Sequence, residues 1–118
     1  MTDLRNTKVL IAVFAMPGCG ACDEYLPRFG RQVRRFQQAG APFHIWHPGD
    51  EIVPGMIPVL IYDAAADNAE LQAFADRLKI VATPTTAMLT RPSVVKVEGA
   101  IDDAQIEQLL RSAAVANR

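Results

Sequence analysis

The chain has 118 residues, half of them hydrophobic, which suits one compact domain over 1–118 rather than two. Twelve Lys and Arg against thirteen Asp and Glu give a formal net charge of −1, so there is no basic excess to attract nucleic-acid phosphates. The longest uninterrupted apolar run, Val9 to Met16, is far shorter than the roughly 20 residues of a membrane-spanning helix. Composition therefore argues against nucleic-acid and membrane partners.

The amino-terminal region loosely imitates a secretion signal, because Lys8 precedes an apolar segment that ends shortly before Cys19. That segment is short, Met16 and Pro17 suit a cleavage site poorly, and cleavage would remove a predicted strand. We therefore expect a cytoplasmic protein. In a reducing compartment, a single pair of cysteines is more often catalytic or metal-binding than structural.

Two elements are predicted before residue 41. Residues 8–16 are apolar after Lys8, include β-branched side chains and lack helical spacing, which predicts a strand buried on both faces. After the cysteines, apolar residues recur at steps of three and four, which predicts an amphipathic helix ending near Gly40. The apolar positions of this helix are Leu26, Phe29, Val33 and Phe36.

Residues 41–58 are crowded with Pro and Gly, and we interpret them as an insert with a short strand near 43–46 and an irregular loop. Residues 59–63 follow as another buried strand. Asp67 and Glu70 have the spacing of a capping box ahead of a second helix. The apolar positions predicted for the buried face of that helix are Leu71, Phe74, Ala75 and Leu78.

The last third of the chain predicts a hairpin and a helix. Residues 85–89 and 94–98 are strand candidates separated by a plausible turn. Asp102 and Gln105 have the spacing of a helix cap, ahead of a helix with an apolar stripe at Ile106, Leu109, Leu110 and Ala113. The order β, α, β, α, β, β, α predicts an α/β fold in which helices cover a mixed sheet with an antiparallel hairpin.

The only two cysteines lie in the segment MPGCGACDEYLP, residues 16–27, and they could form a redox couple, half of a zinc site or two small hydrophobic residues. Cys19 lies where strand gives way to helix, and the unpaired N–H groups of a helix start favour a thiolate. Cys22 follows one turn later on the same face, within reach of a disulfide. Gly18 and Gly20 leave the first sulfur uncovered. Thiol–disulfide exchange, with attack by Cys19 and release by Cys22, is the chemistry that this arrangement favours.

These features resemble the thioredoxin family. The resemblance is carried by CGAC after a buried strand, by Pro27 five residues beyond Cys22, by LKIVATPTTAML, and by VEGA ahead of the last helix. It covers most of the chain, except residues 41–58 and a short amino end that lacks the usual first strand and helix. The resemblance implies a thioredoxin fold and a thiol–disulfide oxidoreductase that needs no cofactor beyond a redox-active Cys19–Cys22 disulfide.

The resemblance also implies roles for residues around the cysteines. Pro84 should follow a cis peptide bond that places the Thr83 backbone beside the cysteines, where it can pair with a substrate strand. Gly99 should keep the adjoining groove open. The implied partners are protein disulfides and a thiol or reductase electron donor, acting on a monomer. The implied substrate-binding residues are Gly18, Gly20, Ala21, Thr83, Pro84 and Gly99.

Two residues depart from the family pattern. Val13 stands six residues before Cys19, where thioredoxins carry a buried acid that helps move the proton of the second cysteine. We therefore expect resolution by Cys22 to be slower near neutral pH than in ordinary thioredoxins. Gly18 stands where thioredoxins have Trp, so substrate contacts must differ. Candidates for a replacement base are Asp23, Glu24, His44 and His47.

The residues between the cysteines bear on the direction of electron flow. Gly20 and Ala21 include no histidine of the kind that stabilises the thiolate in strong oxidants of this superfamily. This favours a reductase with a potential nearer the ~−270 mV of thioredoxin than the ~−120 mV of DsbA. Thr83 before Pro84 is also common in isomerase and oxidase relatives, which keeps those directions open.

Two alternatives come from other classes of protein. Cys19, Cys22, His44 and His47 would together supply four zinc ligands, although the spacing of the two histidines is tighter than in the usual zinc finger. A non-enzymatic thioredoxin-like module could instead bind a partner through residues 41–58, because long loops in compact domains are often functional.

Overall fold

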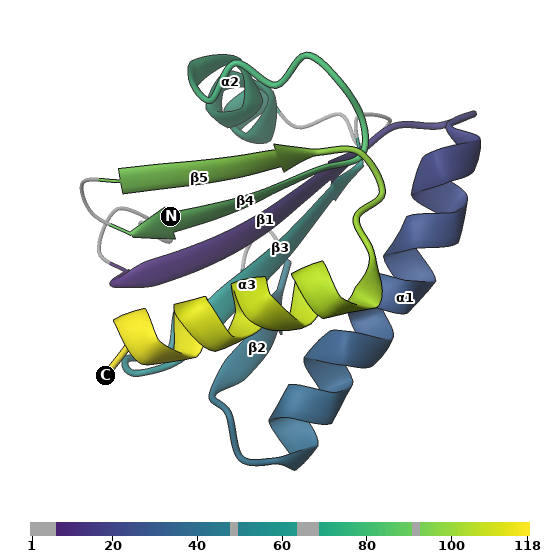
Figure 1. Cartoon of the computed structure of the whole chain (residues 1–118). Helices are drawn as coiled ribbons and strands as arrows, with labels where there is room; N and C mark the ends of the chain where they lie inside the picture. Colours follow the sequence, from purple (N-terminus) through teal and green to yellow (C-terminus); the bar gives the residue numbers. More distant parts are fainter. Residues whose placement is uncertain (1–6, 48–49, 64–68, 91–92) are drawn as a thin grey trace.

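The computed structural model describes residues 7–47, 50–63, 69–90 and 93–118, and every predicted helix and strand is present in it (Figure 1). The predicted α/β class is confirmed. The elements in chain order are β1 (Val9–Ala15), α1 (Gly20–Gln38), β2 (Phe43–Trp46), β3 (Ile57–Asp63), α2 (Ala69–Arg77), β4 (Thr85–Thr90), β5 (Ser93–Glu98) and α3 (Asp103–Ala116).

One mixed sheet holds the five strands in the order β2-β3-β1-β4-β5. β3 pairs parallel to both β1 and β2, whereas β4 pairs antiparallel to both β1 and β5. The β4–β5 pair is the predicted hairpin. β1 is the central strand and all seven of its residues are buried, as expected for a strand covered on both faces. The cysteines follow β1 directly, so they emerge from the middle of the sheet.

The segment expected to be an insert contributes an edge of this sheet. The predicted element order counted one strand between the first two helices, and the structure has two, because β2 pairs with β3 in the register His44 with Pro58. Phe43 and Trp46 are both buried, so β2 is anchored at each end. β3 begins at Ile57, inside the predicted insert, where the Ile57 N–H donates to the Pro42 carbonyl over 2.7 Å. The irregular part of the segment is therefore the connection from β2 to β3.

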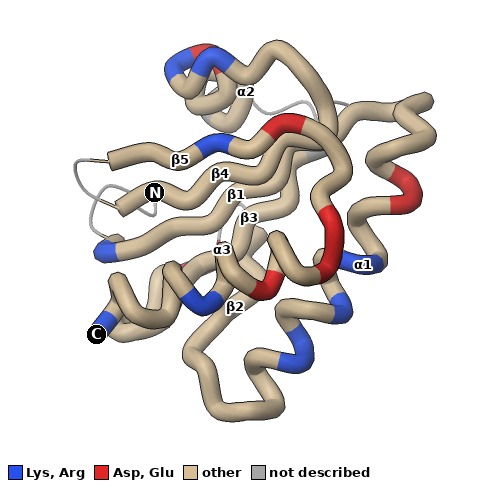
Figure 2. Tube along the Cα trace, in the orientation of Figure 1, with Lys and Arg blue, Asp and Glu red and all other residues tan. Residues whose placement is uncertain are grey.

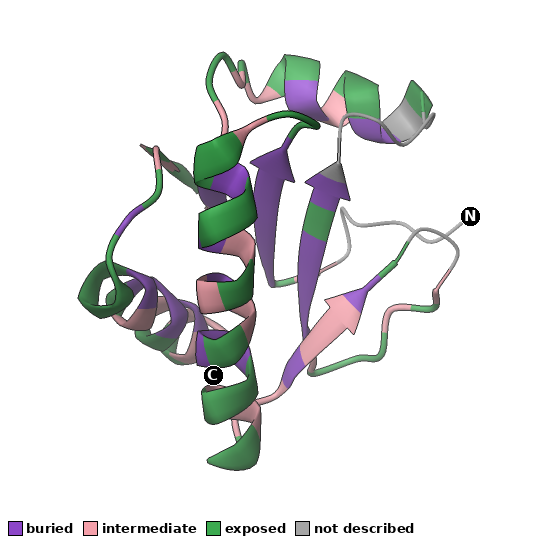
Figure 3. Ribbon diagram, turned by 90° about the vertical axis from the view of Figure 1, so that its right-hand side faces the viewer, coloured by how far each residue is buried: buried purple, intermediate pink, exposed green. Residues whose placement is uncertain are grey.

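The alternation of β1 side chains divides the core into two layers, because successive residues of a strand point to opposite faces. Val9, Ile11 and Val13 pack with α1 and α3 on one face. Ala12 and Phe14 pack with α2 on the other. Figure 3 shows buried and exposed residues alternating along α1 and α3, and the buried ones include members of the cluster that packs on this face of the sheet. The sheet therefore lies between a two-helix layer and a single helix.

The ends of the longer helices agree with the sequence signals. α1 is followed by Gly40, whose φ of +94° is a left-handed conformation that favours glycine. At α3 the Asp102 carboxylate accepts from the Gln105 N–H over 2.8 Å, and the Gln105 side-chain oxygen accepts from the Asp102 N–H over 3.0 Å, which confirms the capping box. Asp67 of the cap predicted for α2 lies outside the described residues. Within the described part of the chain, no helix has the length and hydropathy needed to cross a membrane.

Leu110 should be a major contributor to stability, because its side chain is fully buried between α3 and the sheet. Leu110→Ala is expected to lower the free energy of unfolding by about 2–5 kcal/mol, from lost apolar burial and the cavity left behind. Val115→Ala is the matched control on the same helix, since Val115 is 58% exposed and should change stability by less than about 0.5 kcal/mol. Denaturant unfolding followed by circular dichroism measures both, and equal effects would contradict this packing.

Candidate active site

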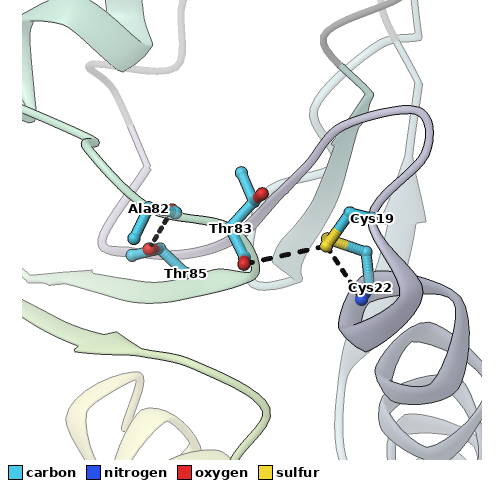
Figure 4. Close-up of a disulfide and its surroundings, with 5 residues drawn as sticks. All are labelled: Cys19, Cys22, Ala82, Thr83 and Thr85. Carbon is cyan, nitrogen blue, oxygen red and sulfur yellow. Dashed lines mark hydrogen bonds between the residues drawn. A yellow bond between two sulfur atoms is a disulfide. The ribbon is translucent and has the colours of Figure 1, made fainter.

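The sulfur of Cys19 caps the amino end of α1. The backbone of Cys19 is extended, and its Sγ accepts a hydrogen bond from the Cys22 N–H at 3.1 Å (Figure 4). The chain reaches this position through Gly18, whose φ of +74° is strained for any residue with a side chain. Cys19 and Cys22 form a disulfide with 5.2 Å between their Cα atoms. Once this bond is reduced, the same N–H group and the helix dipole favour a thiolate on Cys19.

The two sulfur-bearing residues differ in how far solvent reaches them. Cys19 is partly exposed, whereas Cys22 is 1% exposed. Gly20 and Ala21 are exposed between them, as is Gly18 just before. An incoming molecule can therefore reach the first cysteine without displacing the second. This difference suits Cys19 to attack a partner and Cys22 to act only within the protein.

The start of β4 faces the cysteines. The peptide bond between Thr83 and Pro84 is cis, which confirms the prediction. The Thr83 carbonyl oxygen lies 3.7 Å from Cys19 Sγ (Figure 4). The Gly99 N–H donates to the Pro84 carbonyl at 2.8 Å. Thr85 steadies this turn by donating from its hydroxyl to the Ala82 carbonyl over 2.6 Å.

Of the residues predicted to bind substrate, the structure places Thr83 beside Cys19, which was predicted to be catalytic, and holds Gly99 to Pro84. Gly99 has a φ of +91°, and a Cβ there would meet no atom within 4 Å. Glycine is therefore favoured here by the left-handed backbone conformation and not by a lack of room for a side chain. Substrate contact by the six predicted residues stays a prediction.

The four residues of the zinc alternative are not brought together. His44 lies on β2 at the edge of the sheet, two strands away from the strand that leads to Cys19. His47 follows β2 with a side chain 75% exposed and Nδ1 3.5 Å from the Asp50 carboxylate. Among the residues that the structure describes, no group of three or more His, Cys, Asp or Glu is placed to hold a metal ion. The zinc alternative is therefore wrong for this set.

Carboxylates gather near the exposed side of the site, and Arg28 organises them. Figure 2 shows acidic residues on the first turns of α1 and α3, with basic residues of α1 beyond them. The Arg28 guanidinium contacts the Glu24 carboxylate at 2.5 Å and Asp103 at 3.1 Å, and it donates to the Ile101 carbonyl at 2.8 Å. Its hydrogen bond to Glu24 is the main reason that the pKa of this carboxyl is lowered. Arg28 therefore joins α1 to the start of α3.

A buried polar pair that the sequence did not predict joins α1 to β4. The Tyr25 hydroxyl and the Thr86 Oγ1 are 2.7 Å apart, and the two residues are 0% exposed. Burial raises the pKa of Tyr25 above its ordinary value, although the hydrogen bond to Thr86 opposes the change. Helical spacing from Cys22 could have placed Tyr25 on the buried face. The contact with Thr86 spans 61 positions, so no local pattern could have found it.

The four residues predicted as candidate replacement bases lie at two separate places in the fold. Asp23 and Glu24 are exposed on the first turn of α1, while Cys22 is turned into the protein. His44 and His47 belong to the β2 edge. The place of Val13 itself is apolar, since this fully buried side chain packs in the layer under α1 and α3.

The fold is that of thioredoxins. The oxidised thioredoxin of Plasmodium falciparum aligns with a TM-score of 0.59 and 17% identity over 92% of this chain and 83% of that one. For the Malassezia sympodialis thioredoxin the TM-score is 0.56 and the identity 21%, over 92% and 76% of the two chains. Mitochondrial thioredoxin 3 of Saccharomyces cerevisiae, in its oxidised form, aligns with a TM-score of 0.60 and 15% identity over 91% of this chain and 80% of that one. No protein-family model and no curated protein sequence matches the chain. The predicted thioredoxin fold is confirmed.

The Arg28–Glu24 contact predicts a measurable titration. Because the pKa of Glu24 is lowered from 4.5 in the folded protein, the contact stabilises the protein at neutral pH and loses that effect as pH falls through the lowered pKa. In Arg28→Met, the Glu24 pKa should rise toward its ordinary value, as measured by NMR of the side-chain carboxyl carbon. Arg34→Met, on an exposed position of the same helix, should leave it nearly unchanged. A Glu24 titration that is identical in the Arg28 variant and the parent protein would contradict the assignment.

Proposed function

We propose that the protein is a thiol–disulfide oxidoreductase that reduces protein disulfides through Cys19 and Cys22. The observation that carries this proposal is the difference between an accessible sulfur capping α1 and a buried partner that already forms a disulfide with it. The thioredoxin fold of the chain supports the same chemistry. No bound cofactor takes part, because the two sulfurs themselves store the electrons.

The first step is attack by Cys19. Its thiolate bonds to one sulfur of the substrate disulfide, the substrate S–S bond breaks, and the other substrate sulfur leaves as a thiolate that takes a proton from solvent. The Cys22 N–H at 3.1 Å and the start of α1 stabilise the attacking thiolate. Thr83, with its carbonyl 3.7 Å from Cys19 Sγ, lies where substrate backbone would pass.

The second step closes the protein disulfide. Cys22 loses its proton and attacks Cys19 Sγ, the bond from Cys19 to the substrate breaks, and the second substrate sulfur leaves as a thiol after taking a proton. Two electrons have then passed to the substrate, and the protein is oxidised. A thiol or a reductase returns two electrons in the next cycle.

The reductive direction rests on the surroundings of the sulfurs. Gly20 and Ala21, between the cysteines, carry no charge, and Asp23 and Glu24 next to them are exposed carboxylates that oppose a strongly stabilised Cys19 thiolate. A weakly stabilised thiolate makes the reduced form a better electron donor. We assign substrate contacts to Thr83 beside Cys19, to Pro84 and the Gly99 that bonds to it, and to the exposed residues Gly18, Gly20 and Ala21.

Single cysteine variants test the two steps separately. Cys19→Ser should abolish reduction of insulin by the protein with dithiothreitol as electron donor, to the rate of dithiothreitol alone, because the attacking sulfur is gone. Cys22→Ser should also lose turnover, yet it should accumulate a mixed disulfide with substrate that mass spectrometry detects as an added mass on Cys19. Equal loss with no trapped adduct in Cys22→Ser would contradict the assigned order of attack.

The binding-module alternative makes the opposite prediction in cells. If the 41–58 segment is the functional surface, a Cys19→Ser/Cys22→Ser variant keeps the biological activity, whereas shortening the β2–β3 connection abolishes it. Under the proposed function the double cysteine variant is inactive. Substitution of the exposed residue Val53, in the connection, is then neutral.

A further inference from the structure

The Tyr25–Thr86 pair lies next to Val13, the residue that stands where the resemblance implies an acid. Val13 and Thr86 are directly opposed in the antiparallel β1–β4 pair, so their side chains lie on the same face of the sheet. The Thr86 hydroxyl therefore lies beside the side chain that replaces the acid, and Tyr25 reaches it from α1 at 2.7 Å. The strand register and the hydrogen bond therefore place two hydroxyl groups near Val13, although β1 has an apolar side chain at this position.

Tyr25 also shares a helix face with the resolving cysteine. It follows Cys22 by three residues in α1, a spacing that brings Cβ atoms to about 5–6 Å, and the two residues are 0% and 1% exposed. The hydroxyls of Tyr25 and Thr86 each carry one proton, and the hydrogen bond between them needs only one of the two. The second proton remains available to a neighbouring acceptor when Cys22 becomes charged.

We propose that Tyr25 stabilises the Cys22 thiolate in the resolving step by donating a hydrogen bond, and that Thr86 is the positioning residue that orients Tyr25. The inference rests on the proposed function and deepens it. Cys22 gives its proton to solvent, and the thiolate then attacks Cys19 Sγ as described above. The Tyr25 hydroxyl donates a hydrogen bond to the Cys22 thiolate but keeps its own proton, so no proton passes between the two residues.

The surroundings of Tyr25 make it a donor rather than a base. Its raised pKa keeps the phenol neutral across the pH range of thiol exchange. Apolar residues of β1, β2, β3 and α3 pack in the same core cluster as Tyr25. From α1 it faces Arg28, whose guanidinium carbon is 5.5 Å from the ring centroid and whose charge is shared with Glu24 and Asp103. The raised pKa of Arg28 keeps that charge constant over the same pH range.

The test is the reaction of fully reduced protein with dithiobis(nitrobenzoic acid), followed by stopped-flow absorbance across pH. The first released chromophore reports attack by Cys19 and the second reports resolution by Cys22. Tyr25→Phe keeps the ring and removes the hydroxyl. The second phase should slow about tenfold near neutral pH, and the pH of its half-maximal rate should rise by about one unit, as expected for loss of a hydrogen bond to a charged sulfur. The first phase should be unchanged.

Tyr62→Phe is the matched control, because Tyr62 is also buried and donates its hydroxyl to Gln72, on the opposite face of the sheet. It should leave both phases and the pH profile unchanged. An unshifted second phase in folded Tyr25→Phe would overturn the inference while leaving the proposed function intact. Absence of a second phase in the parent protein would instead overturn the proposed function.

Thr86→Val supplies an independent variant, since it removes the partner that orients Tyr25 and keeps the side-chain shape. It should shift the second phase in the same direction, and the double variant with Tyr25→Phe should be no slower than Tyr25→Phe alone. Additive slowing would contradict a shared hydrogen bond. If Tyr25→Phe does not fold, the direction of the shift in Thr86→Val decides.

Discussion

A sulfur atom takes the place of the oxygen that usually caps a helix at the start of α1. Cys19 Sγ accepts from the Cys22 N–H, and this one interaction sets the direction of the first turn. It points Cys22 into the protein and leaves Cys19 at the surface. β1 makes the arrangement possible, because a strand buried on both faces delivers the cap to the middle of the sheet.

Three contacts between distant parts of the chain then complete the surroundings of the cap. Arg28 binds the Ile101 carbonyl and so fixes α3 against α1. The Gly99 N–H joins the end of β5 to Pro84, and Thr83 thereby faces Cys19. The hydroxyl pair of Tyr25 and Thr86 joins α1 to β4. The site is therefore assembled by the packing of four elements rather than by the CGAC segment alone.

Much of this fold could be predicted from local patterns, because each pattern states a local physical preference. The β-branched run predicted β1, helical spacing predicted the face of α1 that carries Phe29 and Val33, and Asp102 with Gln105 predicted the start of α3. The cis bond before Pro84 followed from family resemblance and not from composition. β2 was underestimated because its membership of the sheet depends on pairing with β3, which no local signal encodes. The hydroxyl pair was missed for the same reason.

The central claim is that Cys19 and Cys22 form a two-electron redox couple poised to reduce protein disulfides. Equilibration of the pure protein across ratios of reduced to oxidised dithiothreitol, with alkylation of free thiols and detection by mass, measures its midpoint potential directly. The account predicts one two-electron transition near about −270 mV. A midpoint near about −180 mV would indicate an isomerase or oxidase, and failure to form the intramolecular disulfide at any ratio would contradict the redox function itself.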